Sequence, residues 1–197
     1  LNQRAGKLKE WLESPTGTRP AFWVPGFFNP AGFIAAFKQE VFKYKKNDKQ
    51  TGGGEITLDR VVLKWVPDAE EVDPKVYLAN QKRSDNKDRF ITIILYGLFL
   101  EGAIWKESLQ DDKNTNSRTP IVKFPVIRVE GSIEETNKNI LTSTTSQSYK
   151  CPLYKYPKRT DKYFIIEIGL KIQDSGSGGK DEKYWQKRGV ALLCNQE

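Results

Sequence analysis

After residue 57 the spacing of the hydrophobic residues changes from helical to a period of two, and this change limits the possible fold more than any other feature. The clearest run is "YFIIEIGLKIQ" (163–173). Alternation of this kind is typical of a β-strand with one buried face. The side chains predicted to face inward are Phe164, Ile166, Ile168, Leu170 and Ile172. The side chains predicted to face outward are Glu167, Gly169, Lys171 and Gln173.

Four more segments have strand patterns, at 58–67, 89–105, 121–131 and 188–194. The first places Val61, Leu63 and Trp65 on one face, and the second is either two strands around Gly97 or one bent strand. The third contains Pro125, which is typical of an edge strand or a bulge. Because no helical pattern separates these strands, the sequence predicts an antiparallel sheet of about six strands that curls into a barrel.

The first fifty residues have helical patterns instead. Leu8, Trp11 and Leu12 have the spacing of an amphipathic helix within residues 1–13. Asn29-Pro30 is a helix start, because Asn can cap and Pro suits the first helical position. The second helix is predicted to run to about Lys46. The sequence therefore predicts an α+β fold in one compact unit, with a helical leader at 1–50 and a β-barrel subdomain at 55–197.

Composition excludes several classes of function. The 197-residue chain has no histidine, which removes the usual general base and metal ligand. Its two cysteines, Cys151 and Cys194, cannot form a cysteine-rich zinc site, and they favour an intracellular setting. No stretch approaches the ~18 continuous apolar residues of a membrane span. The Gly-rich segment 51–55 lacks the Lys-Ser/Thr of a phosphate-binding loop, so we expect no cofactor.

The sharpest local cluster is "YKCPLYKYPKRTDKY" (149–163), in a chain whose net charge is +7. Its tyrosines alternate with cations, and three interpretations remain open. It could bind single-stranded nucleic acid by stacking and charge, form a solvated basic rim, or contact another protein. We call six of its residues the basic segment: Lys150, Tyr154, Lys155, Tyr156, Lys158 and Arg159.

Several ordered motifs resemble the C-terminal domain of dynein heavy chains. "FWVPGFFNPAGFIAAFKQE" is similar to the W-x-x-G-F-F-x-P-x-G-F stretch that opens that domain, and "LDRVVLKWV" resembles its next strand. "YGLFLEGAIW", "KFPVIRV", "YKCPLYKYPKR" and "GVALLC" follow in the family's order. The Leu-Phe-Leu-Glu-Gly form favours the axonemal branch. Pro25 departs from the pattern, since the family often has Ser there.

The resemblance implies a helical leader and a small, incomplete antiparallel β-barrel. It also implies a role without catalysis: the domain docks on the AAA+ ATPase modules of its own heavy chain and tunes a minus-end-directed motor. Microtubules and the larger dynein complex would be indirect partners, and the location would be the cytoskeleton of a cilium or flagellum. A nucleic-acid-binding barrel is the alternative.

The same resemblance gives an expected role to an apolar turn. We call its residues the aromatic junction: Phe22, Trp23, Phe27, Phe28, Phe33 and Phe37. They are expected to close one end of the barrel or to pin the helix at 30–46 against it, and the ATPase ring could cover part of them. Burial of each large side chain stabilises the fold by about 1.5–3 kcal/mol.

Overall fold

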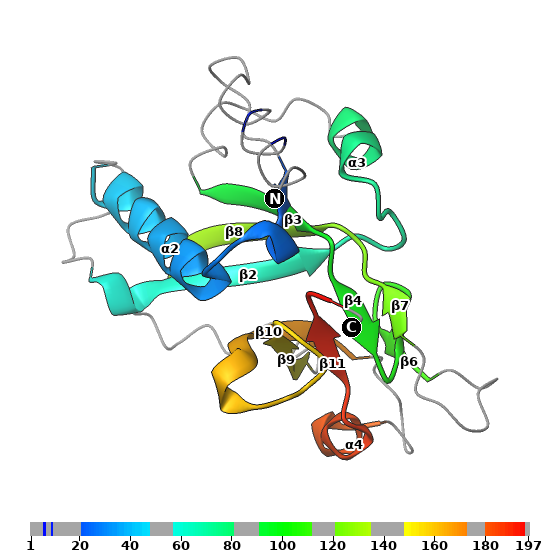
Figure 1. Cartoon of the computed structure of the whole chain (residues 1–197). Helices are drawn as coiled ribbons and strands as arrows, with labels where there is room; N and C mark the ends of the chain where they lie inside the picture. The colour runs from blue at the N-terminus through cyan, green and yellow to red at the C-terminus, as the bar shows by residue number, and fades with distance from the viewer. Residues whose placement is uncertain are drawn as a thin grey trace.

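The computed structural model describes residues 6, 9, 21–47, 57–80, 91–111, 121–134, 148–172 and 180–195. These residues form an α+β domain in which helices α2, α3 and α4 surround three β-sheets (Figure 1). Of the leader helix predicted within 1–13, only Gly6 and Lys9 are described, and both are helical. The predicted loop at 51–55 and most of the loop at 174–181 lie outside the described residues.

The first sheet has four strands in the order β1-β3-β8-β2. Their bounds are β1 Phe22–Trp23, β3 Thr92–Tyr96, β8 Ile127–Ile133 and β2 Val61–Pro67. In β2, Val61 is buried while Val62 and Lys64 are exposed, which confirms the predicted alternation. Strand β1 pairs with β3 in parallel, whereas the other pairs are antiparallel.

The second sheet has five strands in the order β10-β9-β11-β4-β7. Their bounds are β10 Phe164–Lys171, β9 Ser148–Tyr154, β11 Ala191–Leu193, β4 Phe99–Glu101 and β7 Ile121–Lys123. Strand β11 pairs with β4 in an antiparallel ladder and with β9 in a parallel one. A third sheet is the short hairpin of β5 (Ile104–Trp105) and β6 (Leu109–Gln110).

The prediction of one antiparallel sheet curled into a barrel is wrong. Two segments that look continuous in sequence cross from one sheet to the other. The chain leaves β3 at Gly97, which has a φ of 89°, and enters β4 in the second sheet. Pro125, which cannot donate to a ladder, separates β7 from β8. These breaks divide the strands between sheets, and no sheet of the described residues closes into a barrel.

Helix α2 (Pro30–Asn47) forms where the sequence predicts it. The Asn29 side chain accepts a hydrogen bond from the Gly32 backbone N–H at 2.9 Å, which is the expected cap. The buried residues of α2 recur at helical spacing on one face: Pro30, Ile34, Phe37 and Val41. A Cβ at Gly131 of β8 would lie only 2.3 Å from a methyl group of Val41, so the glycine lets the helix approach the sheet closely.

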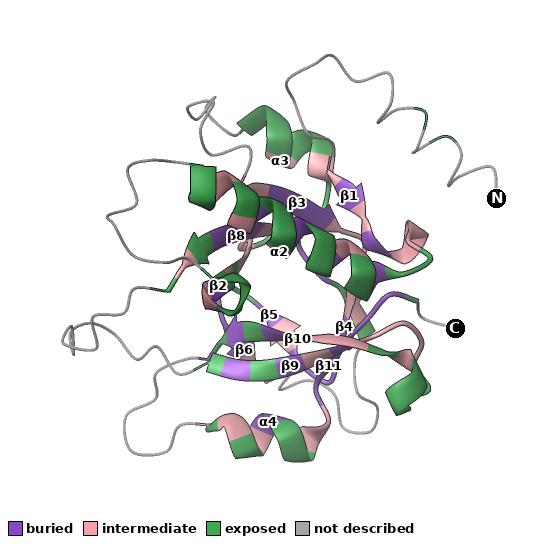
Figure 2. Ribbon diagram, turned by 90° about the vertical axis from the view of Figure 1, so that its left-hand side faces the viewer, coloured by how far each residue is buried: buried purple, intermediate pink, exposed green. Residues whose placement is uncertain are grey.

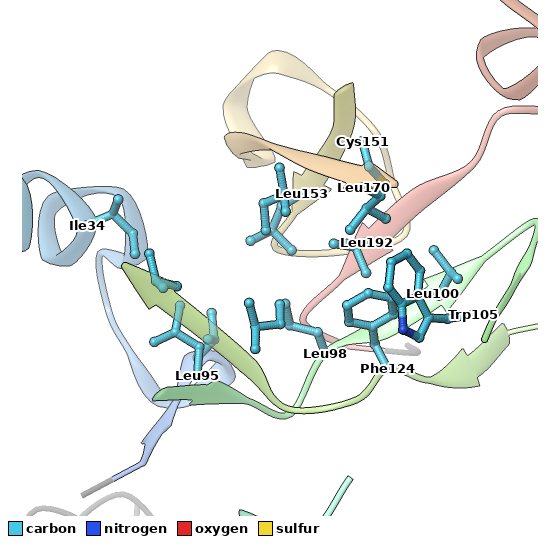
Figure 3. Close-up of a cluster of buried hydrophobic side chains, with 14 of the residues drawn as sticks. Ile34, Leu95, Leu98, Leu100, Trp105, Phe124, Cys151, Leu153, Leu170 and Leu192 are labelled. Carbon is cyan, nitrogen blue, oxygen red and sulfur yellow. The ribbon is translucent and has the colours of Figure 1, made fainter. Parts of the chain in front are cut away.

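The core lies between the two larger sheets and includes side chains from both. Figure 3 shows side chains from both sheets, among them Leu95 of β3 in the first and Leu153, Leu170 and Leu192 of β9, β10 and β11 in the second. The predicted inward positions Ile168 and Leu170 of β10, and Ile172 just after it, are buried, but Phe164 is exposed. The ladder between β9 and β10 shifts register between Phe164 and Ile166, and this irregularity turns Phe164 outward.

Two seven-residue helices were not predicted: α3 (Pro74–Asn80) and α4 (Glu182–Arg188). They lie at opposite ends of the domain in both views (Figures 1 and 2). Each has a sequence signal at its start, Asp73-Pro74 for α3 and Asp181 for α4, and Gly189 ends α4 in the left-handed conformation.

Candidate functional site

Three rings of the aromatic junction form a cluster between β1 and the start of α2. Phe27 stacks on Phe33, with ring centroids 4.3 Å apart, and Phe33 lies 4.9 Å from Phe22. Phe22 is held in place because β1 pairs with β3. The cluster therefore joins the first strand of one sheet to the first turn of α2.

Trp23 contacts the bend at which the backbone passes from one sheet to the other. A Cβ at Gly97 would lie 2.5 Å from Cδ1 of the Trp23 indole, and the positive φ of Gly97 also favours glycine. On the other side, a Cβ at Gly26 would lie 2.8 Å from Cε3 of the same ring. Two glycines thus make room for one indole.

The other two residues of the aromatic junction differ in burial. Phe37 is buried in the core, whereas the Phe28 side chain is 85% exposed. Of the six residues, Phe22, Phe27, Phe33 and Phe37 therefore pack in or against the same core, Trp23 contacts the sheet-to-sheet bend, and Phe28 faces solvent.

A cavity of about 10 Å³ lies beneath the junction, between the two larger sheets. Its lining is entirely apolar and includes Phe27, Phe33, Trp65, Leu98 and Ile166. The volume is about that of one water probe, but a water needs polar partners to be held there. The cavity offers no acid, base or nucleophile, so it cannot support catalysis.

The basic segment spans the end of β9 and the loop that leads to β10, and its rings pack within the domain. Tyr154 lies edge-on to Phe164 at 5.9 Å, and Tyr156 lies edge-on to Tyr163 at 5.0 Å. The Lys155 ammonium lies 5.6 Å from the Tyr156 ring centroid. Bases stack on open ring faces, so this packing gives no particular support to the nucleic-acid alternative.

Arg159 acts inside the domain. Its Nη2 donates to the Glu101 carboxylate at 2.6 Å, and its Nη1 donates to the backbone carbonyl of Gly189. Both partners of the ion pair are partly exposed to solvent, with side-chain exposures of 29% and 21%. Two other cations of the basic segment, Lys150 and Lys158, are exposed. Among the described residues, neither forms an ion pair like that of Arg159.

We call the contacts of Arg159 with Glu101 and Gly189 the clamp. The clamp brings together three of the segments that carry the resemblance. Glu101 comes from "YGLFLEGAIW", Arg159 from "YKCPLYKYPKR", and Gly189 opens "GVALLC". A second arginine also joins the end of α4 to the residue after β4, because Arg188 Nε donates to the Gly102 carbonyl at 2.7 Å. The motifs therefore meet at one intramolecular junction between β4, the loop after β9 and the end of α4.

Sequence reasoning missed the residues that fix α4. Asp111 accepts a hydrogen bond from the Tyr184 hydroxyl at 2.7 Å and forms ion pairs with Lys180 and Arg188. The Tyr149 hydroxyl donates to the Val190 carbonyl at 2.7 Å. The cap signals at Asp181 and Gly189 could have revealed the helix, but long-range partners such as Asp111 have no local signature.

The titratable groups of this region are tuned by burial and not for reaction. Burial raises the pKa of Cys194 to about 12, and it also raises the pKa values of Cys151 and Tyr149. A thiol must ionise to act as a nucleophile, so these cysteines are unreactive at neutral pH.

The described residues contain no group of three or more metal-ligating side chains. Among the helices that are described, none has the length and apolar character needed to cross a membrane.

Fold and site together define an α+β domain organised around an internal clamp of ion pairs and hydrogen bonds. A family model, described as the C-terminal domain of the dynein heavy chain, matches residues 1–194. The protein belongs to this family.

Relatives with an axonemal or flagellar name match nearly the whole sequence. Dynein axonemal heavy chain 5 of Mus musculus is 30% identical over 200 residues, which cover 99% of this chain. The dynein gamma chain of the flagellar outer arm of Chlamydomonas reinhardtii is 29% identical over 200 residues, again 99% of this chain. The match covers only 4% of the length of each of these relatives.

Proposed function

We propose that this protein is a non-catalytic regulatory domain that docks on the AAA+ ATPase ring of its own dynein heavy chain. The motor would be minus-end-directed on microtubules and would work in a cilium or flagellum, as the names of its relatives suggest. The observation that carries the proposal is the family match over residues 1–194.

The proposed mechanism is differential stabilisation. A domain without a reactive site can change a motor only if it binds some conformations of the ring more tightly than others. A rigid domain does this better than a flexible one, and the clamp at Arg159 and the aromatic cluster at Phe27 both join separate elements. The aromatic junction would then serve as a structural junction of the docked unit.

The exposed cations of the basic segment are the proposed electrostatic contact. Lys150 and Lys158 are exposed, and the net charge of the whole sequence is +7, which favours an acidic partner surface. Arg159 would act indirectly, because it holds the segment against β4. Contacts of this kind weaken as salt is added.

The proposal is tested by truncation of the heavy chain immediately before Leu1. Loss of the domain should change the ATPase rate and its stimulation by microtubules while ATP binding remains. Charge reversal at Lys150 and Lys158 together should shift the same rates in the same direction by a smaller factor. Reversal of Lys106, an exposed lysine in the turn between β5 and β6, is the matched control. Unchanged rates in the truncated motor would contradict a regulatory role.

A further inference from the structure

Helix α3 has no buried residue, although it contains several large apolar side chains. Val72, just before the helix, is 42% exposed, and Val76 and Leu78 within it are 44% and 38% exposed. Only Pro74 and Tyr77, three residues apart on one face, are partly covered by the domain. Apolar side chains are therefore open on both flanks of α3, with the polar residues Lys75 and Asn80 also exposed.

A helix of seven residues needs support, because isolated helices shorter than about 12 residues are marginal in water. Packing supplies little of it here. Caps supply some: the Asp73 carboxylate accepts from the Lys75 N–H at 2.8 Å, and the Asp73 carbonyl accepts from the Tyr77 N–H at 3.0 Å. Caps fix where the helix begins, but they do not cover its apolar side chains.

The base of α3 is held much more firmly than the helix. Asp68 Oδ1 accepts from the backbone N–H groups of Glu70 and Glu71 at 3.0 and 2.9 Å. Asp68 N–H donates to the Val126 carbonyl at 2.8 Å, and the Trp105 indole N–H donates to the Asp68 carbonyl at 2.7 Å. An apolar helix is thus presented on a base fixed to both β8 and the β5–β6 hairpin.

The base is also acidic, in contrast to the rest of a protein that is basic overall. Segment 68–73 contains four carboxylates: Asp68, Glu70, Glu71 and Asp73. Within the described part of the structure, none of them forms an ion pair with Lys or Arg. Their hydrogen bonds go to backbone N–H groups, which leave the net negative charge in place. The complementary surface is an apolar groove with a rim of cations.

We propose that α3 is a docking helix that places Val76 in an apolar groove on the ATPase ring of the same heavy chain, with Val72 and Leu78 at the flanks of the contact and Lys or Arg at the rim facing Glu70 and Asp73. This rests on the proposed function and adds the surface through which docking occurs. Because α3 and the basic segment lie toward opposite ends of the domain (Figures 1 and 2), they would contact different parts of the ring. Two such contacts let one rigid domain brace more than one ATPase module.

Photo-crosslinking in the intact heavy chain tests the assignment. The change Leu78→p-benzoylphenylalanine places the probe on α3, and Val62→p-benzoylphenylalanine places it on β2, where the side chain has a similar exposure of 39%. The α3 probe should crosslink to a peptide of the ATPase ring that contains apolar residues and Lys or Arg. The β2 probe should give no such product.

A second variant shows whether burial drives the contact. Val76→Asp puts a charge into the proposed apolar interface and should reduce the ring crosslink from position 78 about tenfold. Val62→Asp should leave that yield unchanged. If Val76→Asp leaves the yield of the ring crosslink from position 78 unchanged, the assignment of α3 as an inserted helix is wrong.

Other crosslink partners also decide the question. Products with residues 1–20 or 81–90 of the domain, or with a second copy of it, would show that α3 is covered by something other than the ring, and they would overturn the inference. If probes at Lys150 or Lys158 reach the ring while position 78 does not, the inference fails and the proposed function stands. If no position of the domain reaches the ring, both fail.

Discussion

Helices α3 and α4 have the same length, seven residues, and differ in almost everything that holds a helix in place. Helix α4 buries Trp185, which is 1% exposed, and is capped by Asp181 and Gly189. Helix α3 is capped at its start but buries nothing. Figure 2 shows α3 with an exposed outer surface at one end of the domain and α4, which includes a buried position, at the other.

The difference separates two uses of a short helix. Ion pairs and hydrogen bonds from Asp111, Tyr149 and Arg159 connect α4 and the two residues after it to three other parts of the domain. The domain itself therefore determines where α4 lies. For α3 the domain fixes the base and partly covers Pro74 and Tyr77, so we infer that a partner covers the exposed side of the helix.

The largest expected effect is at the centre of α4. Trp185→Ala should lower the free energy of unfolding of the 197-residue domain by about 3–5 kcal/mol, because it leaves a large cavity in the core. Urea denaturation followed by far-UV circular dichroism measures this. A loss below about 1 kcal/mol would mean that α4 is not fixed by the domain.

The next effect is at the clamp. Arg159→Ala should lower the free energy of unfolding by about 1–2 kcal/mol, because the Glu101 carboxylate and the Gly189 carbonyl lose their donor. Lys158→Ala, one residue away and exposed, should change it by less than about 0.5 kcal/mol. If the two changes lower the free energy of unfolding equally, the contacts of Arg159 contribute no more to stability than an exposed lysine does.

Alkaline pH should weaken the attachment of α4 through Tyr149. Burial raises the pKa of Tyr149 in the folded state, so the unfolded state loses this proton first. The stabilisation is complete below the ordinary tyrosine pKa of about 10 and decreases above it, by at most about 1.4 kcal/mol per pH unit. Tyr149→Phe should show a shallower loss of stability above pH ~10 than the unchanged protein in parallel titrations. Identical slopes would exclude this contribution.

The smallest effect is expected on α3. Val76→Ala and Leu78→Ala should each change the free energy of unfolding of the 197-residue domain by less than about 0.5 kcal/mol, because both side chains are already exposed. A larger loss in the same urea experiment would show that α3 is part of the domain's own core and would remove the basis for a docking role.

Local rules predicted much of the fold. Asn29-Pro30 located the start of α2, and the alternation of Val61, Leu63 and Trp65 located β2. The two-sheet arrangement was missed because Gly97 and Pro125 mark a break without showing where the backbone goes next. Helices α3 and α4 were missed because seven residues are too few for a helical period to stand out against neighbouring loops.

The candidate site was harder to predict than the fold. The sequence identified Arg159 as one cation of a basic surface, whereas the structure places it against Glu101 and Gly189, which are distant from it in sequence. Pairing over such distances follows from tertiary packing and leaves no spacing to detect. The roles of the aromatic junction and the basic segment, and the division at residues 50–55, stay predictions.

Hydrogen exchange of the two helices, measured by mass spectrometry in the intact heavy chain and in the isolated 197-residue domain, tests the central claim most directly. The account predicts that α4 amides are protected in both, while α3 amides exchange rapidly in the isolated domain and are protected at least about 100-fold in the heavy chain. Rapid exchange of α3 in the intact heavy chain would contradict the claim that a partner covers this helix.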